Sequence, residues 1–313
     1  MNQKSTFAIL IVILSLTAAG SAAAQGAEKH VFVTVLDSSG APFEGLTADH
    51  FAVRESGSER PVDRVEPLRT AMHLAVLVDT SAVSAATDQA FRKALLEFVE
   101  QLAAFNHVAV YASGDRAAPV VPFTQDPAQL RSGMAGMFAW AHTRSHLIDT
   151  VDLALRDLAP IESPRPVIVA ITAETPEASR TSAGSAVKRL IAQSTAFHVI
   201  SLASATGSGG ISTMGANVET SSQRLQGMIA TGEGDKERTR IYQLGTSATG
   251  GSVQRLTSTL AFGPAFTRLA RELSSGYRLT FTRQGSGKIK DLQVGIMVDG
   301  ATLRAIAAPS GTK

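Results

Sequence analysis

The residues best suited to chemistry follow an apolar segment that ends in a carboxylate and two hydroxyls. Residues 74–78 are all Leu, Val or Ala, and Asp79, Thr80 and Ser81 come directly after them. Such a run is typical of a strand buried on both faces of a parallel sheet. Side chains at its carboxyl end face the crevice in which open α/β sheets bind ligands. Because carboxylate and hydroxyl oxygens are the ligands that Mg²⁺ and Ca²⁺ prefer, Asp79 and Ser81 are candidate metal ligands.

The elements that must position this crevice alternate between strands and helices. The predicted strands are 73–78, 107–112, 119–123, 166–172 and 197–202, and the predicted helices are 87–105, 147–158, 187–192, 262–273 and one that begins at Asp126-Pro127. The strands are apolar or β-branched runs, and the helices carry apolar residues at a helical period. This alternation predicts an α/β fold with a doubly wound, mainly parallel, Rossmann-like sheet and helices on both faces.

Short strands at both ends of the chain predict a small β unit. The candidates are 30–36, 52–55 and 62–65 at the start, with the last two as a hairpin around Gly57, and 277–282, 292–298 and 302–307 at the end. Neither group alone makes a stable unit, so we expect the two groups to pair with each other. The expected division is a signal peptide (1–24), an N-terminal β segment (25–66), the α/β domain (67–274) and C-terminal strands (275–313).

Residues 203–238 interrupt the alternation with many Gly, Ser and Thr residues. A structureless stretch of that length is uncommon inside a compact domain, so we interpret it as a flexible surface excursion that carries a short helix. Residues 240–244, which follow it, are expected to add an edge strand.

The first residues have the composition of a secretory signal peptide. Lys4 gives a positive start, residues 7–16 form an apolar core, and residues 21–25 offer a small-residue cleavage site. The apolar core is too short for an ordinary membrane span, and no later segment reaches that length. We therefore expect an exported protein, periplasmic or secreted, with no transmembrane segment after cleavage.

Composition narrows the classes of partner. The chain has no Cys, so its stability must come from buried apolar surface and not from disulfides, even in a compartment that allows them. Lys and Arg number 29 against 27 Asp and Glu, and no basic run stands out. Nucleic-acid binding therefore has no electrostatic support.

Four phrases of the chain occur in a characteristic order: 33–40, 45–51, 248–251 and 270–278. The first two read as a strand, a turn and a Gly-Leu-Thr-Ala-Asp-His-Phe segment, and the last two as a Thr-Gly-Gly loop and a helix that leads into a strand. This order resembles the von Willebrand factor type A-related proteins abundant in acidobacterial genomes. The resemblance runs through almost the whole chain after the predicted cleavage point, and it implies a type A-like fold for residues 67–274.

The same resemblance implies a metal-ion-dependent adhesion site that is degenerate. The family motif is Asp-x-Ser-x-Ser, whereas this chain reads Asp79-Thr-Ser81-Ala-Val83, so the third position has no hydroxyl. A Thr on a later loop of the family aligns with Ser145, which keeps one. The resemblance therefore leaves three of the usual ligand positions with a suitable oxygen.

A carboxylate of the family aligns with Ala173, next to Glu174. The implied site is weakened, and its candidate residues are Asp79, Ser81, Ser145, Ser84 and Glu174. It would hold Mg²⁺ weakly, with water in place of the lost ligands, or hold no metal at all. The alternative is that Asp79 caps the helix that follows and that Ser81 satisfies backbone groups of the loop.

Other motifs give little support for catalysis. His142 and His146 are four residues apart but lack the Glu of a zinc-protease helix, and no Gly-x-Ser-x-Gly elbow occurs. Residues 207–210 are rich in Gly but lack the Lys-Ser/Thr ending of a phosphate loop. Asp149 and Asp152 are interpreted as acids of the first helical turns, which the helix dipole favours.

The expected function is therefore that of an exported, non-catalytic protein-interaction or adhesion module, whose partner is an unidentified protein. One alternative is a structural envelope protein that keeps the fold without a ligand site. The other is an α/β-fold hydrolase, which the fold alone does not exclude. The missing set of nucleophile, base and orienting residue argues against that second alternative.

Overall fold

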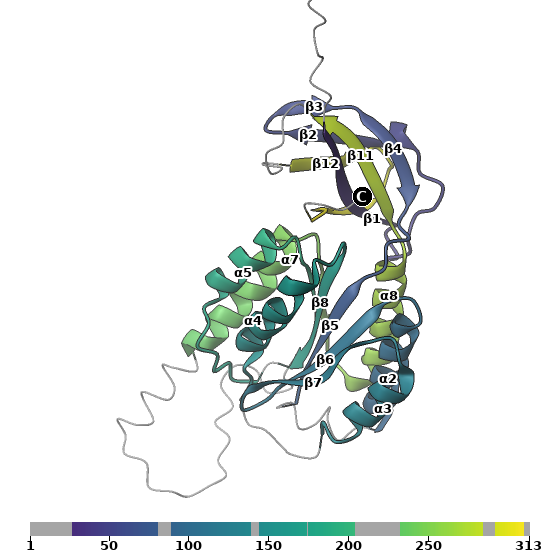
Figure 1. Cartoon of the computed structure of the whole chain (residues 1–313). Coiled ribbons are helices and arrows are strands. Elements are labelled where there is room, and N and C mark those ends of the chain that lie inside the picture. Colours follow the sequence, from purple (N-terminus) through teal and green to yellow (C-terminus); the bar gives the residue numbers. More distant parts are fainter. Residues whose placement is uncertain are drawn as a thin grey trace, which may run out of the picture.

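The structure is a computed structural model that describes residues 27–80, 89–138, 144–173, 175–203, 232–283 and 292–309. A small β unit lies against one end of an α/β domain, and β11 continues directly from helix α8 of that domain (Figure 1). Residues of the predicted signal peptide lie outside the described ranges. Within those ranges, no helix is both long and apolar enough to span a membrane.

The central sheet has six strands in the order β10-β9-β8-β5-β6-β7. They are β5 (His73–Asp79), β6 (His107–Ser113), β7 (Ala117–Thr124), β8 (Pro166–Ala173), β9 (Ala196–Leu202) and β10 (Val253–Leu256). All neighbours are parallel except β7, which runs antiparallel to β6. The chain winds outward from β5 through β6 and β7, and then restarts on the other side of β5 with β8. This reversal confirms the predicted doubly wound, mainly parallel sheet.

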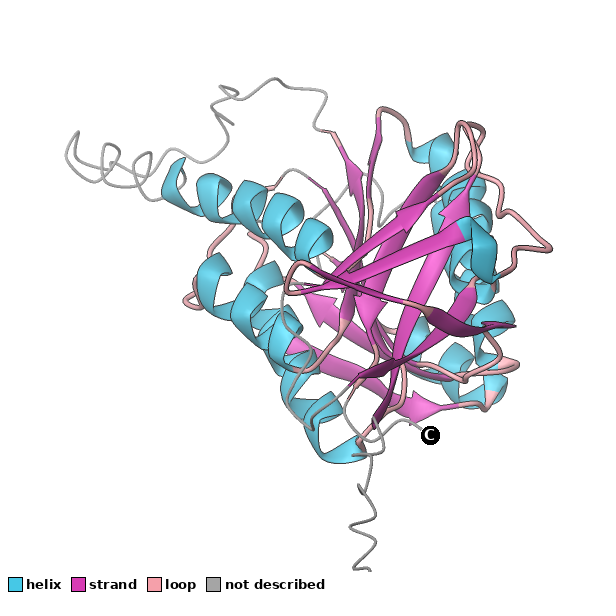
Figure 2. Ribbon diagram, turned by 90° about the horizontal axis from the view of Figure 1, so that it is seen from above, coloured by secondary structure: helices cyan, strands magenta, loops and turns pink. Residues whose placement is uncertain are grey.

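Helices cover both faces of this sheet (Figures 1 and 2). One face carries α2 (Gln89–Ala103), α3 (Pro127–Ala135) and α8 (Phe262–Ser274); the other carries α4 (Leu147–Leu158), α5 (Ala183–Ala192) and a helix over 232–240. Successive side chains of β5 enter opposite layers: Leu74 and Val76 join the cluster under α2 and α8, and Ala75 and Leu77 join the cluster under α4 and α5. Burial on both faces explains why β5 reads as a continuous apolar run.

The β unit consists of two sheets with the orders β13-β1-β11-β4 and β12-β2-β3. Its strands are β1 (Ala27–Leu36), β2 (Phe51–Glu55), β3 (Ser58–Arg60), β4 (Val62–Pro67), β11 (Tyr277–Arg283), β12 (Leu292–Ile296) and β13 (Thr302–Ala307). Strands from the two ends of the chain alternate in the first sheet, and β12 joins β2 in the second. Their inner faces share one apolar cluster that includes Val31, Val53 and Phe281.

Short helical segments complete the fold: η1 (Ala48–His50), η2 (Ala159–Ile161), the π-helical turn η3 (Ile241–Gly245), α7 (Thr246–Ala248) and η4 (Thr259–Ala261). Two of the helical segments begin at a capping side chain. Thr47 closes a capping box with His50 at η1, and the Asp126 carboxylate accepts a hydrogen bond of 2.8 Å from the Ala128 amide at α3. Both caps are formed by residues close in sequence, so they depend little on the rest of the fold.

The predicted hairpin between 52–55 and 62–65 is wrong. β2 instead pairs with the polar strand β3, across a two-residue turn in which Ser56 and Gly57 have φ values of 49° and 79°. Two successive residues with positive φ close a hairpin at once. β4 is therefore free to pair with β11 in the other sheet.

The predicted edge strand at 240–244 is also wrong. These residues continue the helix over 232–240 into η3, and Ile241 and Tyr242 are buried against the cluster under α4 and α5. The edge strand next to β9 is β10. It follows Gly251, where a Cβ atom would lie 1.8 Å from the Phe197 carbonyl oxygen, so only glycine allows this approach. Of the predicted excursion, 204–231 lies outside the described residues and 232–238 is helical.

Candidate functional site

Asp79 ends the central strand β5 at the carboxyl edge of the sheet and is only 5% exposed. Its Oδ2 atom accepts hydrogen bonds from the Thr172 hydroxyl at 2.9 Å and the Thr175 hydroxyl at 3.2 Å, with the Ala173 amide at 3.5 Å. All three donors come from the end of β8 or the loop after it. This carboxylate oxygen is thus surrounded by hydrogen-bond donors of the protein itself.

Ser145 is fully buried next to the end of β6, the strand that pairs with β5 at Asp79. Its hydroxyl is 3.2 Å from the hydroxyl of Ser113, the residue that pairs with Asp79 in the sheet. The Ser145 backbone is fixed on both sides, since its amide donates to Pro176 O at 2.9 Å and its carbonyl accepts from Ala178 N at 2.8 Å. The structure therefore brings Ser145 to the predicted crevice, with its side chain bonded to another hydroxyl.

The other predicted ligands cannot be placed in the same way. Ser81, Ser84 and Glu174 lie outside the described residues, as does Val83. Ala173 is the last residue of β8 and is 8% exposed, so a methyl group stands at the position that the resemblance assigns to a carboxylate. Of the five candidate ligands, the described structure brings Asp79 and Ser145 to the crevice.

Glu177 is a crevice residue that sequence reasoning did not identify. It is 5% exposed, and its Oε1 accepts a hydrogen bond of 2.9 Å from the Ser179 amide. Its Oε2 is buried without a hydrogen-bond partner. Burial raises the pKa of Glu177, and the charge of Asp79 adds to this, against the opposing effects of Ser179 and Arg238. A single acid in a loop gave no sequence signal that would separate it from a solvated surface residue.

Arg238 supplies a positive charge from inside the protein. It lies on the helix over 232–240, is 8% exposed, and donates a hydrogen bond to the Thr175 carbonyl oxygen. Its guanidinium also pairs with Asp235 at 3.1 Å and lowers the pKa of Glu177. The helix packs tightly on the loop, because a Cβ atom at Gly234 would lie 2.0 Å from the Glu177 carbonyl oxygen. A fixed cation therefore belongs to the crevice.

The acids of α4 shape the loop after β8 and do not enter the crevice. Asp149 accepts hydrogen bonds from the amides of Arg180 at 3.1 Å and Thr181 at 2.9 Å, and the His146 ring lies 3.3 Å from its Oδ2. Although burial raises it, these bonds hold the pKa of Asp149 below its usual value. Asp152 instead pairs with Arg189. His142 lies outside the described residues.

The described residues fit a divalent metal poorly. Mg²⁺ needs near-octahedral oxygen ligands, and a carboxylate oxygen that already accepts two hydroxyl hydrogen bonds has few lone pairs left for it. Within the described parts of the chain, no group of three or more His, Cys, Asp or Glu side chains is arranged to hold a metal ion. The arrangement is instead suited to keeping the Asp79 carboxylate buried and hydrogen-bonded.

Comparisons with known proteins find solved structures with a similar fold but no relatives in sequence. No family model matches the chain, and no curated protein matches it. Proximal thread matrix protein 1 from the mussel byssus, with a zinc-occupied MIDAS motif, aligns with a TM-score of 0.47 and 10% identity over 72% of this chain and 50% of that one. This chain thus spans about half the length of the mussel protein.

Two further structures align over most of their own length. The conserved hypothetical protein BatB from Bacteroides thetaiotaomicron has a TM-score of 0.43 and 14% identity, over 66% of this chain and 100% of that one. The SpRpn10 VWA domain has a TM-score of 0.39 and 13% identity, over 62% and 93%. At these values the fold assignment rests on the chain's own strand order.

That strand order defines the fold of the α/β domain. The sheet runs β10-β9-β8-β5-β6-β7, its edge strand β7 is antiparallel, and its central strand ends in a buried Asp. This is the von Willebrand factor type A-like, Rossmann-type α/β fold that the resemblance implied. The acidobacterial type of the family stays a prediction.

Proposed function

We propose that this protein is an exported, non-catalytic type A-like interaction module whose divalent-metal site is weakened or lost. The observation that carries the proposal is the hydrogen bonding of Asp79, whose Oδ2 receives the hydroxyls of Thr172 and Thr175. In a working adhesion site this carboxylate faces a metal ion. Here protein hydroxyls provide the compensation that a cation would otherwise give.

The surroundings of Asp79 support the same conclusion. Ala173 contributes a methyl group where a second carboxylate would raise metal affinity, and a carboxylate brings both charge and coordination. Arg238 already places a positive charge beside Glu177. A divalent cation entering this crevice meets fewer anionic ligands and a fixed guanidinium, so the partner protein is held by other contacts than a bridging metal.

An enzyme is the competing class, and one cluster resembles a catalytic triad. The Ser252 hydroxyl lies 3.0 Å from His198 Nδ1, and Glu272 Oε1 lies 3.7 Å from the same atom. A working triad needs the hydroxyl on one ring nitrogen and the carboxylate on the other. Burial also lowers the pKa of His198 to about 4, which makes it a weak base at neutral pH. The cluster therefore favours a structural role over hydrolysis.

Thermal unfolding in Mg²⁺ and in EDTA tests the proposal, because a ligand that binds the native state raises the melting temperature. We expect wild-type protein and Asp79→Asn to show the same small response to millimolar Mg²⁺. The side-chain oxygen of asparagine can still accept the hydrogen bond from the Thr172 hydroxyl, but the negative charge that a metal needs is gone. The variant should therefore fold and yet lose any metal binding that depends on Asp79. A strong wild-type shift that disappears in Asp79→Asn would reinstate a working metal site.

A further inference from the structure

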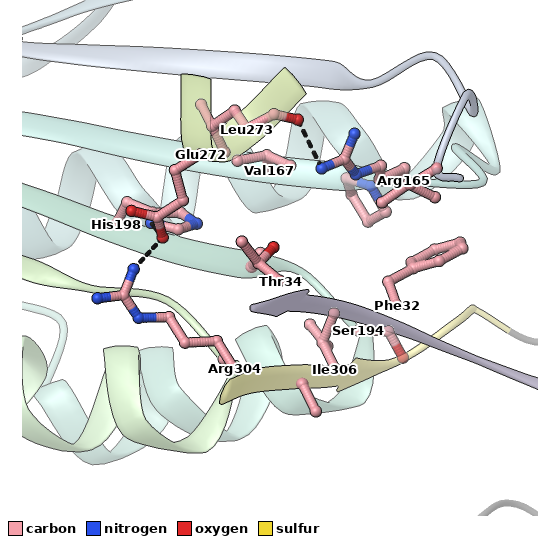
Figure 3. A pocket seen from close by; sticks show the side chains of 15 residues that line it. Phe32, Thr34, Arg165, Val167, Ser194, His198, Glu272, Leu273, Arg304 and Ile306 are labelled. Carbon is pink, nitrogen blue, oxygen red and sulfur yellow. Dashed lines mark hydrogen bonds and ion pairs between the residues drawn. The ribbon is translucent and has the colours of Figure 1, made fainter. Parts of the chain in front are cut away.

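A second polar site lies at the opposite edge of the sheet, between the α/β domain and the β unit. It is a cavity of about 40 Å³ at the start of β8 and β9, closed from the other side by β1 and β13. Figure 3 shows Arg165, His198, Glu272, Arg304 and Thr34 around it, with Arg165 on one side and the Glu272–Arg304 pair on the other. The two parts of the molecule thus meet over a group of charged side chains.

Three of these side chains together carry no net charge. Arg304 of β13 pairs with the carboxylate of Glu272, which is 4% exposed at the end of α8. His198 donates or accepts a hydrogen bond with Ser252 through Nδ1, and burial keeps it neutral at pH 7. The Glu272–Arg304 pair and the neutral imidazole therefore add no net charge to the cavity.

Arg165 is different, because its charge is not matched. Its guanidinium donates a hydrogen bond of 2.8 Å to the Leu273 carbonyl oxygen, and the ion pairs between described residues include none to Arg165. Although its atoms keep some contact with solvent, protein surrounds the group closely enough that burial lowers the pKa of Arg165 to about 10. A guanidinium has five N–H donors in a fixed fork, so donors of Arg165 remain for another acceptor.

We propose that this cavity binds one small monovalent anion, of the size of chloride, nitrate or formate, through the guanidinium of Arg165. An unpaired charge that protein largely shields from water raises the free energy of the folded state, and an anion in contact with the fork offsets that cost. The volume admits about one or two water-sized groups, which suits such an ion and excludes a nucleotide or sugar phosphate. The hydroxyl of Thr34, on β1, faces the same cavity from the β unit.

The location gives the anion a structural consequence. Arg165 belongs to the loop before β8, whereas Thr34 and Arg304 belong to the β unit. An ion between them links the two parts of the molecule across their shared surface. Binding to the folded state then stabilises the protein by mass action, with an effect that saturates once the cavity is filled.

Thermal unfolding in sodium chloride against sodium gluconate, at equal ionic strength, tests this site. Gluconate is too large for the cavity, so the difference isolates anion binding from screening. We expect a saturable rise in melting temperature for wild type and for the exposed control Arg54→Gln, and its loss in Arg165→Gln. An equal rise in Arg165→Gln, or a rise that increases linearly without saturation, would overturn the proposal.

A direct measurement keeps the proposal testable if Arg165→Gln does not fold. Crystals of the wild-type protein soaked in sodium bromide should show an anomalous peak within hydrogen-bond distance of the Arg165 guanidinium. Bromide has the charge of chloride and nearly its size. A cavity that holds only water at molar bromide would contradict the assignment.

Discussion

The two edges of the central sheet handle buried charge in opposite ways. At the carboxyl edge, the carboxyl group of Asp79 accepts hydrogen bonds from the hydroxyls of Thr172 and Thr175, with Arg238 close by. At the amino edge, Arg165 is cationic and has one carbonyl oxygen as its described partner. At the edge where this fold usually binds its ligand, Asp79 is therefore compensated by protein donors, whereas Glu177 Oε2 has no hydrogen-bond partner among the described residues. The proposed anion site at Arg165 follows from unmatched charge and not from topological position.

The largest loss of stability is expected at the amino edge, when the buried ion pair between Glu272 and Arg304 is broken. Arg304→Met leaves Glu272 buried without its cation, and removing one partner of such a pair typically costs about 3–5 kcal/mol. Because the Arg304 side chain is 25% exposed, we expect the lower end of that range. Urea unfolding measures the change in the free energy of unfolding.

The matched control for this variant is Arg156→Met. Arg156 pairs with Asp152 at 3.7 Å, but its side chain is 62% exposed. Surface pairs contribute little, so the control should change stability by about 0.5 kcal/mol or less. Equal small losses in both variants would show that the Glu272 charge is compensated by other groups.

At the carboxyl edge, a smaller loss is expected from Thr172→Val. The change keeps the β-branched shape in β8 but removes the hydroxyl that donates to Asp79 at 2.9 Å. Hydrogen bonds to charged groups contribute about 1.5–3 kcal/mol, and we expect about 2 kcal/mol here. Urea unfolding is again the measurement, and the variant should also respond more to Mg²⁺, since Asp79 loses a competing donor.

Thr267→Val serves as its control. This hydroxyl bonds to the Gly263 carbonyl oxygen on the exposed side of α8, so its removal should change stability by less than about 0.5 kcal/mol. If Thr172→Val were as mild as the control, Asp79 would not depend on internal donors. The contrast between the two edges would then fail.

Acid should affect the two edges in opposite directions. His198 has a pKa of about 4 in the folded protein, below its ordinary value of 6.5, so its contribution to stability is lost as pH falls from about 6.5 towards 4. Glu177 has a raised pKa, so its contribution is present below the ordinary value of 4.5 and is lost as pH rises through the folded value. Each single group changes stability by at most about 1.4 kcal/mol per pH unit.

Variants of these two residues separate the effects. His198→Gln should flatten the loss of stability between pH 7 and pH 5, although His73 and His30, whose pKa values are also lowered, keep part of it. Glu177→Gln should steepen the loss at the acidic end. Urea unfolding at a series of pH values gives both slopes, and equal slopes for wild type and both variants would contradict the assignment.

The α/β elements could be predicted because their signals are local. Residues 147–158 and 262–273 show a clear helical period, and β5 and β8 are continuous apolar runs that only a doubly buried strand explains. The prediction at 240–244 failed because Ile241 and Tyr242 fit either a strand or a helical turn. The tertiary contact with the layer under α4 and α5 decides between them.

The site was predicted only where a local pattern or the motif supplied a position. Asp79 was predicted from its place at the end of a buried apolar strand, and Ser145 came from the resemblance. Glu177 and Arg238 instead enter the crevice through loop and helix contacts that have no fixed spacing in sequence. Arg165 gave no signal, because its significance lies in the lack of an ion pair between it and the other described residues. Compensation of charge is a property of the folded chain and not of a motif.

Calorimetric titration with Mg²⁺ and Mn²⁺ measures whether the crevice at Asp79 holds a divalent metal. The wild-type protein should release little or no binding heat at millimolar metal, because Asp79 is held by hydroxyl donors and Ala173 provides no carboxylate. The double variant Val83→Ser with Ala173→Asp restores a hydroxyl and a carboxylate, and it should bind the metal measurably. Tight binding to the wild type that vanishes in Asp79→Asn would contradict the account and show that the crevice is a working metal site.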